Sequence, residues 1–289
     1  MKTAALALTL ALSSPAQTLT GVIDVHAHSD PDGTARSIDA IDLAKLAKAR
    51  GMRGMVLKNH YEPTASLAYI VRKEVPGIEV FGGISLDLTV GGVNPAAVEW
   101  MTKVKGGYGK VVWMPTFDSE HQVTTSKAQR PFASVAKGGK LLPETEKVLA
   151  IIAKNNLVLE TGHSSPQEAL LLIREAKRVG VQNIIVTHAM NALVGMSIPQ
   201  MKEAAKMGAF LEFVRVAPGS PAIAEFAKAI REVGPEWCIL ASDLGQATNP
   251  LHPDGLLAFY RDLMAQGITE AQINRMAKEN PAKALGLKP

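Results

Sequence analysis

The chain has 289 residues, of which 47% are hydrophobic, and a formal net charge of +4. This composition suits one large domain or two small ones with a substantial core, and it excludes a disordered chain. The basic residues are scattered among acidic ones without a run. We therefore expect no nucleic-acid partner, and the mildly positive surface is compatible with a small anionic substrate.

Residues 1–16 have the pattern of a secretory signal peptide. Lys2 precedes an apolar run, 4–12, that is too short to span a bilayer, and small residues at 14–16 suit cleavage. We expect removal of this segment and export to a periplasm or the cell exterior; a buried N-terminal helix is the alternative. The mature chain, 17–289, should form a single domain with no membrane partner, because no later stretch is long and apolar enough to span a bilayer.

Short apolar runs recur along the chain, with helical patterns between them. Most of the runs are nearly continuous, which is typical of strands covered by helices on both faces. We expect strands at 21–28, 54–60, 79–86, 110–116, 157–163, 183–188, 209–216 and 237–243. This alternation predicts an α/β fold, a (β/α)8 TIM barrel. An open doubly wound sheet is the alternative, but the first strand lacks the glycine-rich turn expected there.

Local signals place several of the helices. Asn94, Ser165 and Ser220 each precede a proline, an arrangement of helix cap and first helical residue, and an apolar stripe runs from Ser37 to Gly51. The interval 117–142, after the fourth expected strand, is long, polar and rich in glycine. We expect it to be a loop insertion over the mouth of the barrel.

Residues with metal-binding side chains end five of the expected strands. In a (β/α)8 barrel, chemistry gathers at the carboxyl ends of the strands, and alternation along a strand places His26 and His28 on one face. Imidazoles and a carboxylate suit zinc first, and also manganese, iron or nickel. The sequence thus predicts a site for one or two divalent ions, with these candidate ligands: His26, His28, Lys58, His163, His188 and Asp243.

These residue types are also suited to hydrolysis. A bound divalent cation lowers the pKa of a coordinated water towards neutrality, and Asp243 is the candidate acceptor for the proton that the water loses. His188 could polarise a substrate carbonyl or bind a second ion. Lys58 could take part in catalysis or, like His60, contact an anionic group of the substrate.

The arrangement resembles the amidohydrolase superfamily of metal-dependent (β/α)8 hydrolases. The motifs that carry the resemblance cover nearly the whole mature chain: Asp24-Val25-His26-Ala27-His28, His163 in Glu-Thr-Gly-His, His188 in Val-Thr-His-Ala, Asp243 in Ala-Ser-Asp-Leu-Gly, and the ending 280–287. The resemblance implies that His26, His28, His163 and Asp243 are metal ligands and that His188 is a ligand or an electrophile. Lys58-Asn59-His60 and Trp113-Met114-Pro115-Thr116, with His121, look like a subgroup of undefined function.

One departure from the superfamily concerns the fourth strand. Two-metal members often bridge their ions with a carbamylated lysine or a glutamate from that strand, whereas here it ends Trp113-Met114-Pro115-Thr116. Lys58 is a candidate substitute, because a lysine with a lowered pKa can take up carbon dioxide. A mononuclear site is the alternative.

Other polar residues are candidates for substrate binding. Thr116 and His121 fall near or within the long insertion, where His121 could close over the site or be an exposed loop residue. Arg215 could clamp a carboxylate, or form an outward salt bridge. His252 could line the mouth, although we expect a surface position.

We therefore expect a metal-dependent hydrolase that cleaves an amide, lactone or ester-like bond of a small molecule. A decarboxylase or another lyase at the same site is one alternative. A non-catalytic periplasmic barrel that binds a ligand is another. The sequence leaves the oligomeric state open, with a homo-oligomer among the expectations.

Overall fold

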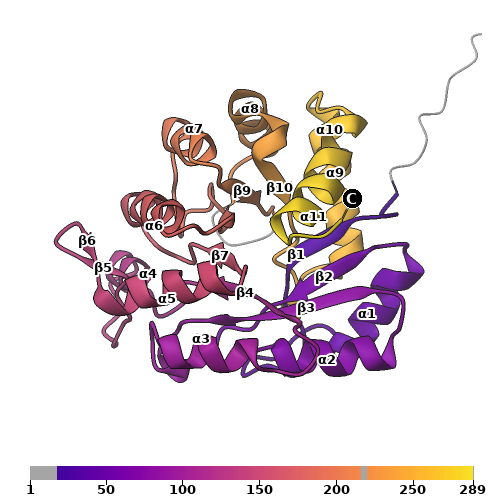
Figure 1. Ribbon diagram of the computed structural model, residues 1–289. Helices are drawn as coiled ribbons and strands as arrows, with labels where there is room; N and C mark the ends of the chain where they lie inside the picture. The colour runs from indigo at the N-terminus through magenta and orange to yellow at the C-terminus, as the bar shows by residue number, and fades with distance from the viewer. Residues whose placement is uncertain (1–17, 216–219, 289) are drawn as a thin grey trace, which may run out of the picture.

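The computed structural model describes residues 18–215 and 220–288. It contains a sheet of eight parallel strands in the order β1-β2-β3-β4-β7-β8-β9-β10, with helices packed around the outside (Figure 1). The strands are β1 Ile23–Ala27, β2 Gly54–Leu57, β3 Glu79–Ser85, β4 Gly109–Trp113, β7 Val158–Glu160, β8 Asn183–Val186, β9 Phe210–Phe213 and β10 Cys238–Leu240. The (β/α)8 barrel predicted from the sequence is confirmed.

The barrel closes between its first and last strands. The backbone N–H of Asp243 donates to the His26 carbonyl at 2.9 Å, and the N–H of His28 donates to the Leu244 carbonyl at 2.8 Å. These bonds lie just beyond the end of β10, so the seam is closed by the residues that end the two strands.

Helices follow most of the strands. They are α1 Ala40–Ala49, α2 Ala65–Glu74, α3 Pro95–Thr102, α5 Pro143–Lys154, α6 Pro166–Arg178, α7 Ile198–Lys206, α8 Ile223–Val233, α9 His252–Ala265, α10 Glu270–Asn274 and α11 Asn280–Ala284. None of the helices among the described residues combines the length and apolar character needed to cross a membrane. The expected signal peptide, 1–16, lies outside the described residues.

Two of the expected caps are confirmed and two helix starts differ. The side chains of Asn94 and Ser165 cap α3 and α6. In α1 the cap is Asp39 instead of Ser37, because the Asp39 carboxylate accepts the N–H groups of Ile41 and Asp42. The Ser220 hydroxyl donates to the Val214 carbonyl at 3.2 Å, and α8 begins three residues later.

The insertion between β4 and α5 is more ordered than a loop. It contains α4, Glu120–Thr125, and a hairpin of β5, Ala136–Lys137, and β6, Lys140–Leu141. Arg130 pairs with Asp118 and also donates to the Phe117 carbonyl. These contacts hold the insertion against the end of β4, next to the mouth of the barrel.

Apolar side chains fill the amino-terminal half of the barrel. Val25, Val56 and Val111 belong to an interior cluster that is closed off by Ala282 and Leu285 near the end of the chain. A second, larger core lies between the strands and the helices. The polar carboxyl-terminal ends of the strands therefore rest on a packed floor.

The helix that closes this floor is anchored by one side chain. The Asn280 amide donates to the carbonyls of Pro235 and Cys238 at 2.8 and 2.7 Å. Removing it leaves two carbonyls without these partners, so we expect Asn280→Ala to lower the free energy of unfolding by about 2 kcal/mol. Urea denaturation measures the change, and Asn155→Ala, at an exposed position, serves as the control. Equal losses in the two variants would contradict the anchoring role.

Candidate metal centre

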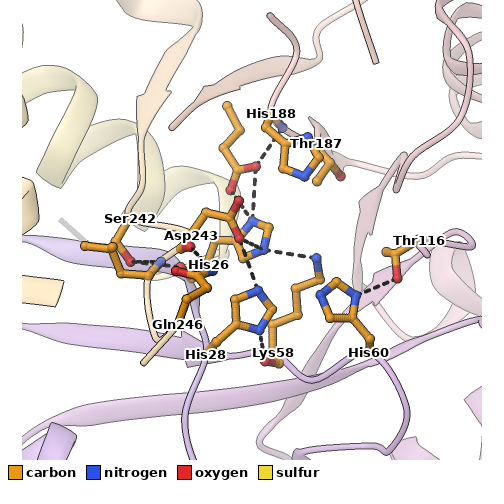
Figure 2. A network of polar contacts seen from close by, with 12 residues as sticks. His26, His28, Lys58, His60, Thr116, Thr187, His188, Ser242, Asp243 and Gln246 are labelled. Carbon is orange, nitrogen blue, oxygen red and sulfur yellow. Dashed lines mark hydrogen bonds and ion pairs between the residues drawn. The ribbon is translucent and has the colours of Figure 1, made fainter. Parts of the chain in front are cut away.

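Two histidines and an aspartate meet at the closed seam of the barrel. His26 lies in β1, His28 is the first residue after it, and Asp243 follows β10. The Oδ1 atom of Asp243 lies 3.0 Å from Nε2 of His26 and 3.1 Å from Nε2 of His28 (Figure 2). All three residues are buried, so little water is available to separate these atoms.

Hydrogen bonds on the far side of each ring assign the tautomers. Nδ1 of His28 donates to the Lys58 carbonyl at 2.7 Å, and Nδ1 of His26 lies 3.1 and 3.2 Å from the carboxylate oxygens of Glu212. Neutral rings of this kind present Nε2 as a lone pair. Three acceptors then face one another, an arrangement that needs a proton or a cation between them. Metal-ligating histidines are commonly held in this way by a carboxylate or a carbonyl.

The charges around the cluster favour one positive charge at its centre. Burial lowers the pKa of His28 to about 3, which keeps that ring neutral. Burial and Lys58 also lower the pKa of His26, but Asp243 and Glu212 outweigh them and raise it to about 10. Without a cation, the proton on Nε2 of His26 therefore faces Asp243 and supplies the positive charge that a metal ion would bring to this place.

Lys58 lies at the same centre. Its Nζ is 3.0 Å from Nε2 of His26 and 5.6 Å from the centre of the Trp113 ring. Burial lowers the pKa of the amine, although nearby carboxylates, beginning with Asp243, oppose this effect. The structure thus places Lys58 with the expected ligands, and its carbamylation stays a prediction.

His163 and His188 bring further ligand atoms to the cluster. Nδ1 of His163 donates to the side-chain oxygen of Gln122 in α4, which leaves Nε2 as an acceptor. That Nε2 atom and Nδ1 of His188 are buried and have no partner among the residues that the structure describes. The two rings lie 4.8 Å apart, and His188 stacks on His26 at 5.8 Å. Buried nitrogens without partners are costly unless a ligand satisfies them, so this donor set fits a divalent cation.

The backbone is strained where two of these side chains leave their strands. His188 has φ of 23° and Asp243 has φ of 51°, values that side chains other than glycine rarely adopt. Such strain persists where the surrounding structure enforces it, and it clusters at functional sites. His188 lies shortly after β8, which ends at Val186, and Asp243 shortly after β10, which ends at Leu240, so the strain accompanies their turn into the mouth.

Two buried glutamates beneath the cluster were missed from the sequence. Glu212 in β9 accepts from the His188 backbone N–H at 2.8 Å as well as from His26. Glu160 in β7 accepts from the Thr187 hydroxyl at 2.9 Å, and burial and then Glu212 raise its pKa to about 8. A charged residue inside an otherwise apolar strand is the signal that could have found them, because a buried charge needs a partner.

His60 and Thr116 lie beside the cluster, as expected. Nδ1 of His60 is 2.8 Å from the Thr116 hydroxyl, and the ring stacks on His28 at 4.9 Å. Burial, and then Lys58, hold the pKa of His60 well below its usual range. This direction favours a neutral ring, and contact of His60 with an anionic group of the substrate stays a prediction.

Two other candidates, His121 and Arg215, lie away from the cluster, and a third, His252, lies directly against it. His121 lines a cavity of about 560 Å³ between α4, the hairpin and α6. Arg215 pairs with Asp262 at 3.0 Å, which is the outward salt bridge considered as its alternative. The expected surface position of His252 is wrong, because His252 is buried and donates from Nε2 to the His28 carbonyl at 2.9 Å.

Gly162 brings His163 close to the end of β4. Its φ is +61°, and a Cβ there would overlap the carbonyl of Met114. We expect Gly162→Ala to cost about 3 kcal/mol or more, because both the backbone and the packing resist the added methyl. Gly180→Ala is a matched control, since Gly180 also has positive φ but has open space around its Cβ position. Thermal unfolding measures both variants, and losses of similar size would show that the close approach is unimportant.

Comparison with known proteins agrees with this architecture. Residues 21–212 match the family described as "Family of unknown function (DUF6282)". The chain belongs to the DUF6282 family. A search of curated proteins finds no match for this DUF6282 member.

Solved structures similar to this DUF6282 member share its fold. An amidohydrolase from Pseudomonas aeruginosa has a TM-score of 0.64 at 13% identity, over 92% of this chain and 95% of that one. A mutant PTE-like lactonase from Deinococcus radiodurans has a TM-score of 0.61 at 16% identity, over 94% and 97% of the two chains. An amidohydrolase from Burkholderia multivorans with bound zinc has a TM-score of 0.62 at 11% identity, over 92% and 99%. These likenesses show a shared (β/α)8 fold, the fold that the sequence predicted.

Proposed function

We propose that this protein is a metal-dependent hydrolase that cleaves an amide, lactone or ester-like bond of a small molecule. The observation that carries the proposal is the convergence of His26 Nε2, His28 Nε2 and Asp243 Oδ1, with the carboxylate oxygen 3.0 and 3.1 Å from the two nitrogens. Amidohydrolases and a lactonase among the similar structures support it, as does the zinc in one of them.

His26, His28 and Asp243 would hold the cation, and His163 and His188 offer further ligand atoms. A divalent cation bound there would supply Lewis acidity, which polarises a carbonyl and lowers the pKa of water. Zinc is the first candidate because the donors are imidazoles and a carboxylate, and one or two ions can be accommodated by the available ligand types.

The chain's own side chains would carry the proton and the developing charge. The carboxylate of Asp243 is buried at the site. Burial alone would raise the pKa of Asp243, but the neighbouring His26 keeps this pKa well below its usual range. The carboxylate would accept the proton that the attacking water gives up. Nζ of Lys58 lies 3.0 Å from His26 Nε2, so a cation bound at that nitrogen would displace this contact. The freed amine, or His188, would then stabilise negative charge on the carbonyl oxygen.

Exposed apolar side chains border the same end of the barrel. Tyr61 follows β2, Leu88 follows β3, and Phe132 lies in the insertion after β4; each is at least 36% exposed. Tyr61 also lies 6.4 Å from the Phe117 ring. Because large apolar groups are costly to leave in water, we infer that they contact an apolar part of the substrate.

Metal analysis of the purified protein tests the proposal. We expect a bound divalent ion and turnover of at least one compound in a panel of amides, lactones and esters, and we expect chelation to abolish turnover and the restored ion to recover it. Release of carbon dioxide from a carboxylated compound, without hydrolysis, would contradict the proposal and indicate a decarboxylase. Ligand affinity that survives chelation, without any turnover, would also contradict the proposal and indicate a non-catalytic barrel that binds a ligand. We also propose that the protein acts after export and on a small molecule, with a homo-oligomer as its candidate assembly.

A further inference from the structure

A chain of three side chains connects the metal centre to the loop after β3. Asp87 accepts from the Thr116 backbone N–H at 2.8 Å through Oδ1 and from the Thr116 hydroxyl through Oδ2. The Thr116 oxygen in turn lies 2.8 Å from Nδ1 of His60. Since the threonine hydroxyl gives its only proton to Asp87, its oxygen can only accept from His60. His60 is buried, and its one hydrogen bond among the described residues is to this hydroxyl, so the ring is neutral and its proton is on Nδ1.

Asp87 is held firmly in this role. It is fully buried, and its Oδ1 atom also accepts the backbone N–H of Asp118 at 3.0 Å. Asp118 in turn accepts from the N–H of Leu88 at 2.9 Å, on the residue after Asp87. The carboxylate thus links the ends of β3 and β4, and it orients the Thr116 hydroxyl.

The His60 ring is fixed between two other rings. It stacks on Phe117 at 3.9 Å and on His28 at 4.9 Å, with an interplanar angle of 26° in each pair. Figure 2 shows the ring between Thr116 on one side and the cluster of Lys58 and His28 on the other. With Nδ1 committed to Thr116, Nε2 carries a lone pair, and no described residue is hydrogen-bonded to it. Two groups of side chains come close enough to share a cation, His26 with His28 and Asp243, and His26 with Glu160 and Glu212, and His60 belongs to neither.

We infer that Nε2 of His60 accepts a hydrogen bond from a hydroxyl or amide N–H of the substrate, and that Thr116 and Asp87 are positioning residues that fix this tautomer. The inference rests on the proposed function and narrows its substrate class to carbonyl compounds that carry such a donor near the bond to be cleaved. A site built to pair with a substrate donor discriminates strongly against an analogue without it. The expected contact of His60 with an anionic group is thereby replaced by a contact with a neutral donor.

The tautomer can be tested without any substrate. Nitrogen-15 NMR of the histidine side chains distinguishes a protonated Nδ1 from a protonated Nε2. We expect His60 to be protonated at Nδ1 in the unmodified protein and in Thr116→Ser, which keeps the hydroxyl, and to lose this preference in Thr116→Val and Asp87→Asn. Protonation at Nε2 in the unmodified protein would overturn the inference, as would an unchanged tautomer in Thr116→Val.

A matched pair of probes tests the acceptor. We would titrate the zinc-loaded protein with benzamide, which carries N–H donors, and with N,N-dimethylbenzamide, which carries none. We expect benzamide to bind at least tenfold more tightly and to shift the His60 Nε2 resonance, and Thr116→Val to reduce the preference while Thr116→Ser retains it. Equal affinity for the two probes, or no affinity for either, would overturn the inference. Scalar coupling between the His60 nitrogen and cadmium, in protein loaded with cadmium in place of zinc, would also overturn it, because His60 would then be a metal ligand. Failure of zinc to bind at all would instead contradict the proposed function. The tautomer measurement, which needs neither zinc nor substrate, would still test the inference.

Discussion

Asp243→Asn is expected to fold and to lose both the divalent cation and turnover. The carboxylate brings the negative charge that balances the cation, and its Oδ1 is the atom that His26 and His28 both approach. Asparagine keeps the size but removes the charge. Because replacing even an outer partner of a metal ligand typically costs 10–100-fold in affinity, we expect a loss greater than about 100-fold here. Competition with a chromophoric chelator measures it.

A matched surface variant tests whether zinc affinity depends on the aspartate charge at this position or on the loss of any one negative charge. Asp254 is an exposed aspartate at the start of α9 that pairs with Arg50 at 2.9 Å. Asp254→Asn should leave zinc affinity and turnover at the level of the unmodified protein, and circular dichroism should show both variants folded. A folded Asp243→Asn protein that still bound zinc as tightly as the control would contradict the ligand assignment.

Glu212→Gln is expected to cause the second-largest loss of zinc affinity, although Glu212 lies beneath the candidate ligands. Its carboxylate accepts from Nδ1 of His26 and from the backbone N–H of His188, so it orients two of the candidate ligands at once. The substitution removes a buried negative charge next to Lys58 and His26. We expect zinc affinity to fall by about 10–100-fold.

Glu160→Gln provides the comparison at a similar depth in the barrel. Glu160 makes its hydrogen bond to Thr187, and its raised pKa, about 8, means that the carboxyl is mostly protonated at pH 7. Glutamine therefore resembles the native state at this position, and we expect a much smaller change in zinc affinity. If the two variants lost affinity equally, the orienting role assigned to Glu212 would be refuted.

The barrel could be predicted from the sequence because its signals are local. Each buried strand is a short apolar run, and Asn94 and Ser165 cap their helices through residues only a few positions away. The two helix starts that differ have different causes. Ser37 and Ser220 are suitable caps by type, but a neighbouring aspartate caps α1 and the Ser220 hydroxyl bonds elsewhere.

The candidate ligands could be predicted because the barrel brings strand ends together. The residues that hold those ligands could not, since their partners lie far away in the chain: Glu212 is 186 residues from His26, and Gln122 is 41 from His163. His121 illustrates the same limit. The sequence placed it in the insertion, but the helical turn of α4 directs its neighbour Gln122 to the site instead.

The seam between β1 and β10 ties formation of the site to completion of the polypeptide. The Asp243 backbone N–H donates to the His26 carbonyl there, and the same two residues supply converging ligand atoms. A nascent chain that has not yet emerged past β10 has neither a closed ring nor a ligand triad. If the protein binds a cation as proposed, binding at this triad therefore belongs to the last stage of folding, after β10 has been synthesised.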